Sequence, residues 1–448
     1  MANRRRPVAG VDTKSTLMDS VSIGTKARGF LRSLLARERV RQTLLLYGSD
    51  IGLIILTFGS GILNSRFLGP TQYGVYAFVI TVVEAVMLFA GFGFPAAGAR
   101  VVSLAKTRHD EQAIQGALVA IALMMGLCIS LVLAAATPLI QVVFHTQEKS
   151  WLLIASLLCT LAPLQAILTQ ACLGANRIGI LATLSILPKA LYLLGGLGMV
   201  VWAHLTAKTA LMLYFGGSLA SCLLALIALR IRFDQVRSLT REVTAEVKRY
   251  GFKAYLGGIA DTSTYKLNNL LIAGYVNTNW LGFYSIASTM VSPMVRFSIA
   301  LSNSAYRSLG QKKSINKKLF MANGAFLAAS AILIAVIVRP FITIVLTRQF
   351  LPAVGLVYVL LATAFFQGMY QPINAFLCAH GKGRELRSIS LVVCAVNLIV
   401  SLALIPRLGA YGAAIGSSMA KCCELLGNIH YYRKITRQPC SSSEPDGD

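Results

Sequence analysis

Long apolar segments alternate with short polar connections along most of this 448-residue chain. Each segment has about 18 to 28 residues, near the ~20 that an α-helix needs to cross a hydrocarbon core of roughly 30 Å. Helices satisfy their own backbone hydrogen bonds in a bilayer, so apolar segments of this length favour helices. The pattern predicts an all-α polytopic membrane protein with twelve transmembrane helices, at residues 42–64, 75–99, 114–141, 151–174, 180–203, 209–229, 254–274, 282–304, 319–338, 353–378, 388–405 and 410–431.

The basic residues are divided unequally between the two sides of this topology. Of the 42 Lys and Arg residues, 32 lie in the two tails and the connections on their side, six lie in the opposite connections, and four lie inside segments. Short connections rich in Lys and Arg remain in the cytoplasm. The bias therefore predicts a multi-pass protein with both termini on the cytoplasmic side of the membrane.

Composition argues against several other function classes. A chain with 56% hydrophobic and 13% charged residues does not fit a soluble domain. The net charge of +25 is mostly the orientation bias, and the basic residues are not interleaved with aromatic ones, so we expect no nucleic-acid partner. None of the nine cysteines has zinc-type spacing and no Walker motif is present. We expect no metal site, no cofactor and no direct use of ATP.

Two short sequence patterns recur and predict an internal duplication. YGVYA at 73–77, after the first segment, corresponds to LGFYS at 281–285, after the seventh, with a spacing of 208 residues. LGANRIG at 173–179 corresponds to LCAHGKG at 377–383, with a spacing of 204. Because six helices are an even number, both halves enter the membrane from the same side. We therefore expect two six-helix lobes related by a pseudo-twofold axis along the membrane normal.

The duplication and the charged connections divide the chain into five parts. Residues 1–41 form a basic cytoplasmic tail, in which 30–40 mixes Leu and Phe with Arg; an interfacial helix and a disordered tail are both compatible with this pattern. The N-lobe covers 42–229 and the C-lobe covers 254–431. The cytoplasmic connection 230–253 joins them, and its amphipathic part, 239–250, is expected to form a helix on the membrane surface. Residues 432–448 form a second cytoplasmic tail.

Longer motifs carry a family resemblance. FLGPTQYGVYA at 67–77, followed by GFGF at 91–94 and Arg100, resembles the signature of the Wzx-type bacterial polysaccharide flippases. WLGFYSIA at 280–287 and RLGAYGAA at 407–414 continue the likeness, which covers about 44 to 432. The superfamily also includes the multidrug and toxic-compound extrusion transporters. The resemblance implies a bacterial inner membrane protein whose two lobes enclose a cavity, lined mainly by helices 1, 2, 7 and 8, that opens alternately to each membrane face.

Polar residues gather on one face of the same four helices. A charge at mid-bilayer costs about 3 kcal/mol, so these side chains should face water or one another rather than lipid. We expect them to line a central cavity that binds substrate. The candidate residues are Tyr47 and Asp50 on helix 1, Glu84 on helix 2, Asp261, Lys266 and Asn269 on helix 7, and Arg296 and Asn303 on helix 8.

The charges suggest roles within this candidate site. Arg296 and Lys266 are natural partners for the pyrophosphate of a lipid-linked sugar. Asp50 and Asp261 lie at a depth similar to that of Arg296, so they could hold its guanidinium when the site is empty, or carry a coupling proton. The alternative for each charge is a structural ion pair inside a lobe. That alternative is preferred for Lys189 on helix 5, and for Lys421 and Glu424 on helix 12, because these helices should be peripheral and the last two are three residues apart.

The hypothesis that best fits these features is a flippase, not an enzyme, with no catalytic residues. It would move a polyprenyl-pyrophosphate-linked oligosaccharide, in contact with membrane lipids and coupled to H⁺ or Na⁺, for O-antigen (lipopolysaccharide) or exopolysaccharide synthesis. A multidrug or cation antiporter on the same fold remains an alternative, although an acidic cavity would suit it better. A peptidoglycan-precursor flippase usually carries two further helices. A membrane-embedded glycosyltransferase or polymerase would need carboxylates on a large outer loop, whereas Glu148 is the only acid in the outer connections.

Overall fold

The computed structural model describes residues 38–144, 153–156, 159–202, 204–312 and 314–437. These residues are almost entirely helical, and the described part contains no β-strand. The proposed interfacial helix at 30–40 lies largely outside the described residues. The first half contains α2 (Glu38–Ala90), α3 (Phe94–Ser103), α4 (Arg108–Phe144), α6 (Ala162–Gly174), α7 (Ile178–Trp202) and α8 (Ala207–Leu229). The second half contains α10 (Phe252–Tyr275), α11 (Thr278–Gly310), α12 (Lys317–Phe341), α13 (Pro352–Ala379), α14 (Gly383–Leu408) and α15 (Ala410–Arg437).

In the described part of the chain, each of the twelve predicted transmembrane segments is mostly helical. By length and composition, seven described helices could cross a membrane, the first of them, Ile51–Leu88, being long enough to include most of the first two predicted segments. The less apolar helices α10 and α11 carry most of the polar candidate residues. The chain is therefore an all-α polytopic membrane protein, as the hydropathy pattern predicts.

The first two segments are separated by less non-helical chain than predicted, and the second is interrupted once more. They form one continuous element, α2, whose only non-helical residue is Gly69, with φ 70° and ψ 174°, directly before Pro70. Proline removes a backbone donor, and the combination of φ and ψ at Gly69 is one that essentially only glycine adopts, so the pair turns the chain within a single residue. The second segment is broken again between Ala90 and Phe94, where Gly93 has φ 83°. A Cβ on Gly93 would overlap the backbone of Gly251. Glycine at this break therefore allows the inter-lobe connection to pass close to it.

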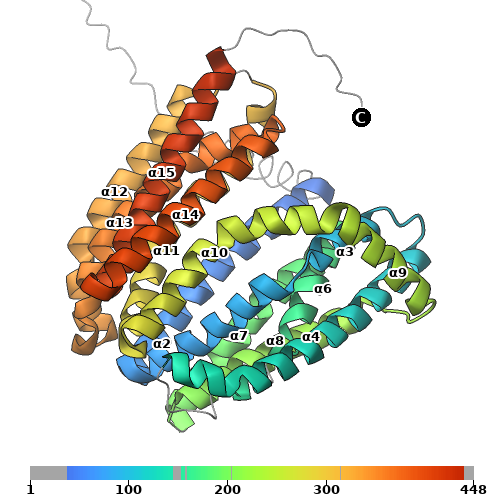
Figure 1. Ribbon diagram of the computed structural model, residues 1–448, viewed down its shortest axis with the longest axis horizontal. Coiled ribbons are helices and arrows are strands. Elements are labelled where there is room, and N and C mark those ends of the chain that lie inside the picture. The colour runs from blue at the N-terminus through green and yellow to red at the C-terminus, as the bar shows by residue number, and fades with distance from the viewer. Residues whose placement is uncertain (1–37, 145–152, 157–158, 203, 313, 438–448) are drawn as a thin grey trace, which may run out of the picture.

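The helices form two groups, seen in Figure 1 as the blue-to-green and the orange-to-red ribbons, with α10 extending between them along α2. Three contacts between helices recur at equivalent positions of the two halves. In the first half α4 packs on α6, α7 on α8 and α2 on α7; in the second, α12 packs on α13, α14 on α15 and α10 on α14. This repeated packing supports the duplication. The pseudo-twofold relation of whole lobes stays a prediction.

The two halves meet at the glycines of the repeated motif. A Cβ on Gly282 would lie 2.8 Å from the carbonyl oxygen of Pro70 and 3.3 Å from Cα of Gly74. A Cβ on Gly74 would overlap the carbonyl oxygen of Thr278. Because 70 and 74 correspond to 278 and 282 at the 208-residue spacing, each glycine contacts the other half at the corresponding position, the pattern expected close to a twofold axis.

The inter-lobe connection packs on the N-terminal half. It contains α9 (Val236–Glu246) and a π-helical turn, η1 (Val247–Gly251), which continues directly into α10. Val243 is fully buried, in an apolar cluster that includes residues of α3 and α4. Arg100 on α3 forms an ion pair with Glu246 at 3.2 Å. The expected amphipathic helix is therefore present, but its apolar face is used to attach the connection to the N-terminal half.

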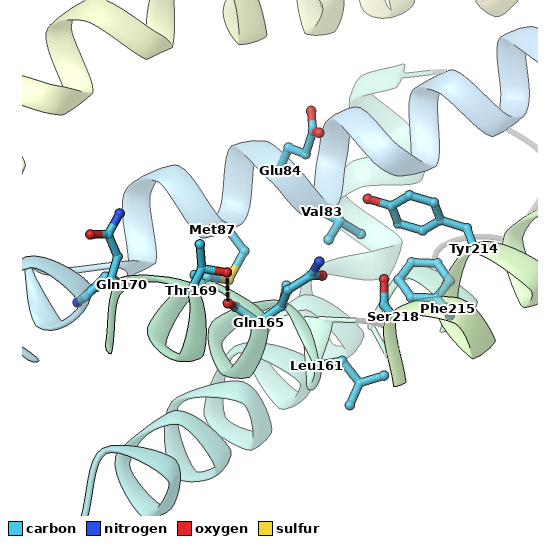
Figure 2. Close-up of a pocket in the computed structure, with 13 residues that line it drawn as sticks. Val83, Glu84, Met87, Leu161, Gln165, Thr169, Gln170, Tyr214, Phe215 and Ser218 are labelled. Atoms are coloured by element: carbon cyan, nitrogen blue, oxygen red, sulfur yellow. Dashed lines mark hydrogen bonds between the residues drawn. The ribbon is translucent and has the colours of Figure 1, made fainter. Parts of the chain in front are cut away.

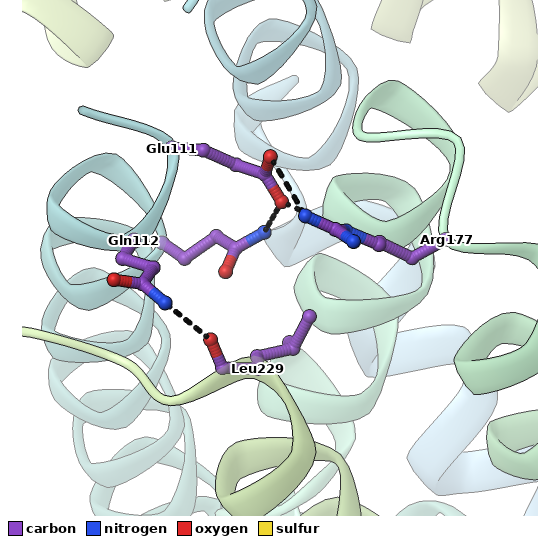
Figure 3. Close-up of polar contacts among 5 residues, drawn as sticks. Glu111, Gln112, Arg177 and Leu229 are labelled. Atoms are coloured by element: carbon purple, nitrogen blue, oxygen red, sulfur yellow. Dashed lines mark hydrogen bonds and ion pairs between the residues drawn. The ribbon is translucent and has the colours of Figure 1, made fainter. Parts of the chain in front are cut away.

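A polar cluster joins the ends of helices on the predicted cytoplasmic side (Figure 3). Arg177 follows the left-handed residue Asn176, with φ 55°, in the turn between α6 and α7. Its guanidinium donates to both carboxylate oxygens of Glu111 on α4, at 3.1 and 3.3 Å. Gln112 donates to the carbonyl of Leu229 at 3.4 Å. Arg177, in the repeated motif at 173–179, thus joins the α6–α7 turn to α4. Gln112 joins α4 in turn to the end of α8.

Candidate functional site

An ion pair between the two halves lies within the predicted membrane segments. Lys266 on α10 donates to the Glu84 carboxylate on α2. The side chains of Lys266 and Glu84 retain 27% and 43% of their exposure, respectively, so a ligand can contact the pair. The structure therefore brings together two of the candidate residues, from helices 2 and 7, that the sequence predicted to share a cavity.

A second lysine belongs to the same cluster. Lys189 on α7 lies with its Nζ 5.1 Å from the ring centroid of Tyr214 on α8, and it interacts electrostatically with both Glu84 and Lys266. We call Lys189, Glu84 and Lys266 the charged cluster. It contains two basic side chains and one acidic side chain.

The expectation that Lys189 forms a structural ion pair inside a lobe stays a prediction. Its contact in the described part of the chain is the ring of Tyr214 on α8, and Pro188 is buried beside it. By contrast, the predicted pair of Lys421 and Glu424 is confirmed, at 2.5 Å and with both residues buried.

The remaining candidate residues have different surroundings. Asn269 on α10 donates to the hydroxyl of Thr81 on α2 at 3.4 Å, so it lies at the same contact between α10 and α2 as Lys266. Arg296 and Asn303 on α11 are exposed, and no ion pair of Arg296 is found in the described part of the chain. Tyr47, Asp50 and Asp261 belong to α2 and α10, but their side chains lie outside the described residues. Their pairing with Arg296 stays a prediction.

A pocket adjoins the charged cluster inside the N-terminal half (Figure 2). Its volume is about 370 Å³, within the range of ~300–1,000 Å³ common for small-molecule sites. Glu84 lies at its rim and projects from α2 on the side away from Gln165 and Thr169 (Figure 2). The lining comes from α2, α3, α6 with the preceding Leu161, and α8: Val83, Glu84, Met87, Pro95, Leu161, Ala162, Gln165, Ala166, Thr169, Gln170, Tyr214, Phe215 and Ser218.

Apart from Glu84, the sequence did not identify this pocket. Gln165, Thr169 and Gln170 lie on one face of α6 at helical spacing, and this periodicity is the signal that could have found them. They carry no charge, however, and a neutral polar side chain in a membrane helix is a weaker sign of a functional site than a charged one. The family resemblance implies a cavity lined mainly by helices 1, 2, 7 and 8, whereas α6 and α8 supply most of the lining of this pocket.

Similar folds occur in solved structures of transporters. The structure of lipid II flippase MurJ in its inward closed conformation matches with a TM-score of 0.72 and 14% identity, over 89% of this chain and 90% of that one. An inward-facing multidrug resistance MATE family transporter of the MOP superfamily matches at 0.67 and 11%, over 87% and 96%. An outward-facing transporter of the same description matches at 0.56 and 13%, over 89% and 95%.

Sequence comparison gives the family. No curated protein shows a significant sequence match to this chain. The polysaccharide biosynthesis protein family matches residues 40–306, which include the first half, the inter-lobe connection, α10 and most of α11. This range covers the motifs at 67–77 and 280–287 and every member of the charged cluster. The chain therefore belongs to the polysaccharide biosynthesis protein family, with the fold shared by the MurJ and MATE transporters.

Proposed function

We propose that this protein is a flippase that moves a polyprenyl-pyrophosphate-linked oligosaccharide from the inner to the outer leaflet of the bacterial inner membrane, for the synthesis of a surface polysaccharide such as O-antigen or exopolysaccharide. The observation that carries the proposal is the charged cluster. It places two ammonium groups and one carboxylate on three helices from both halves of the protein. A pyrophosphate is an anion, and a net positive site in a low-dielectric environment attracts it.

The pairing of Glu84 with Lys266 gives the site a resting state. In the absence of substrate the carboxylate compensates Lys266, which lowers the cost of holding that charge in the membrane. An arriving pyrophosphate competes with Glu84 for the ammonium. Because the pair joins α2 to α10, releasing it also weakens a contact between the two halves. Substrate binding is thereby coupled to the relative movement of the halves, which alternating access requires.

The present conformation is proposed to be an inward one, with its outer side closed. The similarity is greater to the two inward conformations, at TM-scores of 0.72 and 0.67, than to the outward-facing one, at 0.56. The halves also contact each other at Gly74 and Gly282, which the predicted topology places at the outer end of their helices. A closed outer contact is what a transporter needs while it loads substrate from the inner leaflet.

Arg296 is proposed to be a second phosphate-binding residue. It is exposed on α11, so it is available to a ligand entering from the cytoplasmic side. Its planar guanidinium suits bidentate phosphate contact better than an ammonium does. A coupling ion, H⁺ or Na⁺, would act through Asp50, Asp261 or Glu84.

A multidrug or cation antiporter is the rival on the same fold. A cationic drug would be repelled by Lys189 and Lys266, which outnumber Glu84. A clean deletion strain distinguishes the two functions. The flippase proposal expects lipid-linked oligosaccharide to accumulate on the cytoplasmic leaflet and the surface glycan to be lost. Normal surface glycan together with raised drug sensitivity would favour the antiporter.

A further inference from the structure

The pocket beside the charged cluster has a wall of neutral polar side chains that the proposed phosphate site does not include. Gln165, Thr169 and Gln170 line it from α6, and Ser218 lines it from α8. In Figure 2 these side chains lie on the side of α2 from which Val83 and Met87 project, whereas Glu84 points away from them. The pocket therefore offers neutral donors and acceptors next to, but separate from, the charges.

One of these groups is buried without a partner. Ser218 retains 3% of its exposure, and its hydroxyl has no hydrogen-bond partner among the residues that the structure describes. The hydroxyl of Thr169, by comparison, donates to the carbonyl of Gln165 at 2.7 Å. A buried polar atom left unsatisfied destabilises a folded protein, and most such atoms in proteins have partners. Because Ser218 Oγ belongs to the pocket lining, a ligand with hydrogen-bonding groups could satisfy it.

Two aromatic rings complete the wall. Tyr214 and Phe215 are adjacent on α8, with ring centroids 5.1 Å apart and planes at 85°. Apolar ring faces beside amide and hydroxyl groups suit a ligand that has C–H faces and many hydroxyls. Tyr214 also lies under Lys189, at 5.1 Å. This one residue thus connects the neutral pocket with the charged cluster.

We propose that the pocket binds a neutral sugar ring of the glycan while the charged cluster holds the pyrophosphate. The assignment rests on the proposed function, because it divides one substrate between two adjacent sites. A volume of about 370 Å³ accommodates the sugars nearest the pyrophosphate rather than a whole oligosaccharide. The pocket is accordingly the place where the protein recognises the identity of the first sugars, through Gln165, Gln170 and Ser218.

The test compares two ligands that differ only in their sugars. The full-length protein in nanodiscs is titrated with lipid-linked oligosaccharide extracted from the deletion strain, and with polyprenyl pyrophosphate that bears no sugar. The variants are Ser218→Ala and Gln165→Ala. The matched control is Ser221→Ala, which removes a buried hydroxyl from the same helix; that hydroxyl donates to the Ser218 carbonyl at 2.8 Å and does not line the pocket.

The expected result is a loss confined to the glycan-bearing ligand. Ser218→Ala and Gln165→Ala each weaken its binding by about two- to tenfold, the effect of one hydrogen bond, and leave polyprenyl pyrophosphate unchanged. Ser221→Ala leaves both affinities unchanged. Without ligand, Ser218→Ala has the same or a higher melting temperature than the wild type, since it removes an unpartnered hydroxyl, so any loss of binding does not come from poor folding.

Other results overturn the proposal and identify the reason. Equal losses for both ligands would show that the pocket holds the polyprenyl chain or another acyl chain. Unchanged glycan affinity in Ser218→Ala and Gln165→Ala would show that no sugar enters. If the wild type binds neither ligand more tightly than a polyprenol without pyrophosphate, the flippase proposal itself fails. If the wild type binds both pyrophosphate ligands equally, and more tightly than the polyprenol, only the sugar-binding role of the pocket fails.

Discussion

Lys266 on α10 and Glu84 on α2 form an ion pair that crosses from one half of the chain to the other, within the predicted membrane segments. The residues are 182 positions apart in sequence. Neither is fully buried, which distinguishes the pair from the buried Lys421–Glu424 pair inside α15. An interhelical, accessible pair can be opened by a ligand, whereas a buried pair three residues apart in one helix serves mainly to neutralise its own charges.

The first prediction concerns this pair. Lys266→Ala should lower flipping at least about tenfold, because it removes a pyrophosphate contact and leaves Glu84 to repel the anion. Lys266→Arg should retain most of the activity. Both are measured by restoration of surface glycan in the deletion strain at matched protein levels.

A double variant distinguishes binding from a purely structural role. Glu84→Gln with Lys266→Gln keeps the two side chains polar and removes both charges. If the pair only stabilises the contact between α2 and α10, this protein should flip normally. The substrate-binding role expects it to remain inactive while it inserts and melts like the wild type.

The second prediction concerns Arg296. Arg296→Ala should abolish transport without reducing insertion, because its exposed side chain contributes little to packing. Arg296→Lys should recover only part of the activity, since the planar fork for bidentate phosphate contact is lost. The alternative is a purely structural role, in which Arg296 serves only as a counter-ion for Asp261 or Asp50. Restored flipping in the double variant Arg296→Gln with Asp261→Asn would establish that alternative.

Gly74 and Gly282 give a third prediction, on the contact between the halves. A Cβ on Gly74 would overlap the carbonyl oxygen of Thr278, so Gly74→Ala should force the halves apart at a cost of about 1–3 kcal/mol. The expected result is a lower melting temperature and a larger fraction of molecules whose outer contact is open. Gly179→Ala is the matched control, because nothing lies within 4 Å of its added Cβ. Equal melting temperatures for the two variants would show that the contact is not tight.

The fourth prediction tests the orientation. In a protein without other cysteines, Arg237→Cys in α9 should react with an impermeant thiol reagent only from the cytoplasm. Lys208→Cys, on the opposite side of the predicted topology, should react only from outside. Both positions are exposed, so access is set by the membrane. Labelling with the sides exchanged would contradict the topology derived from the basic residues.

Much of the fold could be predicted from the sequence because a bilayer restricts the possible structures. Backbone polar groups must be satisfied inside each span, so apolar length alone located the helices. The interruptions were less predictable. The break at 91–93 lies where the backbone of Gly251 passes close to Gly93, and Gly251 comes from the inter-lobe connection some 150 residues later.

The candidate site was only partly accessible to sequence reasoning. Glu84, Lys266 and Asn269 were found because charges and amides on a membrane helix are costly unless they have partners. Lys189 was set apart from the cavity residues because its helix was judged peripheral, and no rule based on one helix at a time predicts that α7 brings it to the Tyr214 ring. The neutral groups of the pocket, such as Gln165 and Ser218, carry no charge that would draw attention to them.

The central claim is that this protein flips a lipid-linked oligosaccharide by way of the charged cluster, and purified protein in proteoliposomes tests it most directly. The measurement is the fraction of lipid-linked oligosaccharide, extracted from the deletion strain, that becomes accessible to an added glycosidase from the opposite leaflet over time. The account predicts rapid exchange with the wild type and little with Lys266→Ala. Exchange equal to that of protein-free liposomes, across tested H⁺ and Na⁺ gradients, or equal rates for the two proteins, would contradict it.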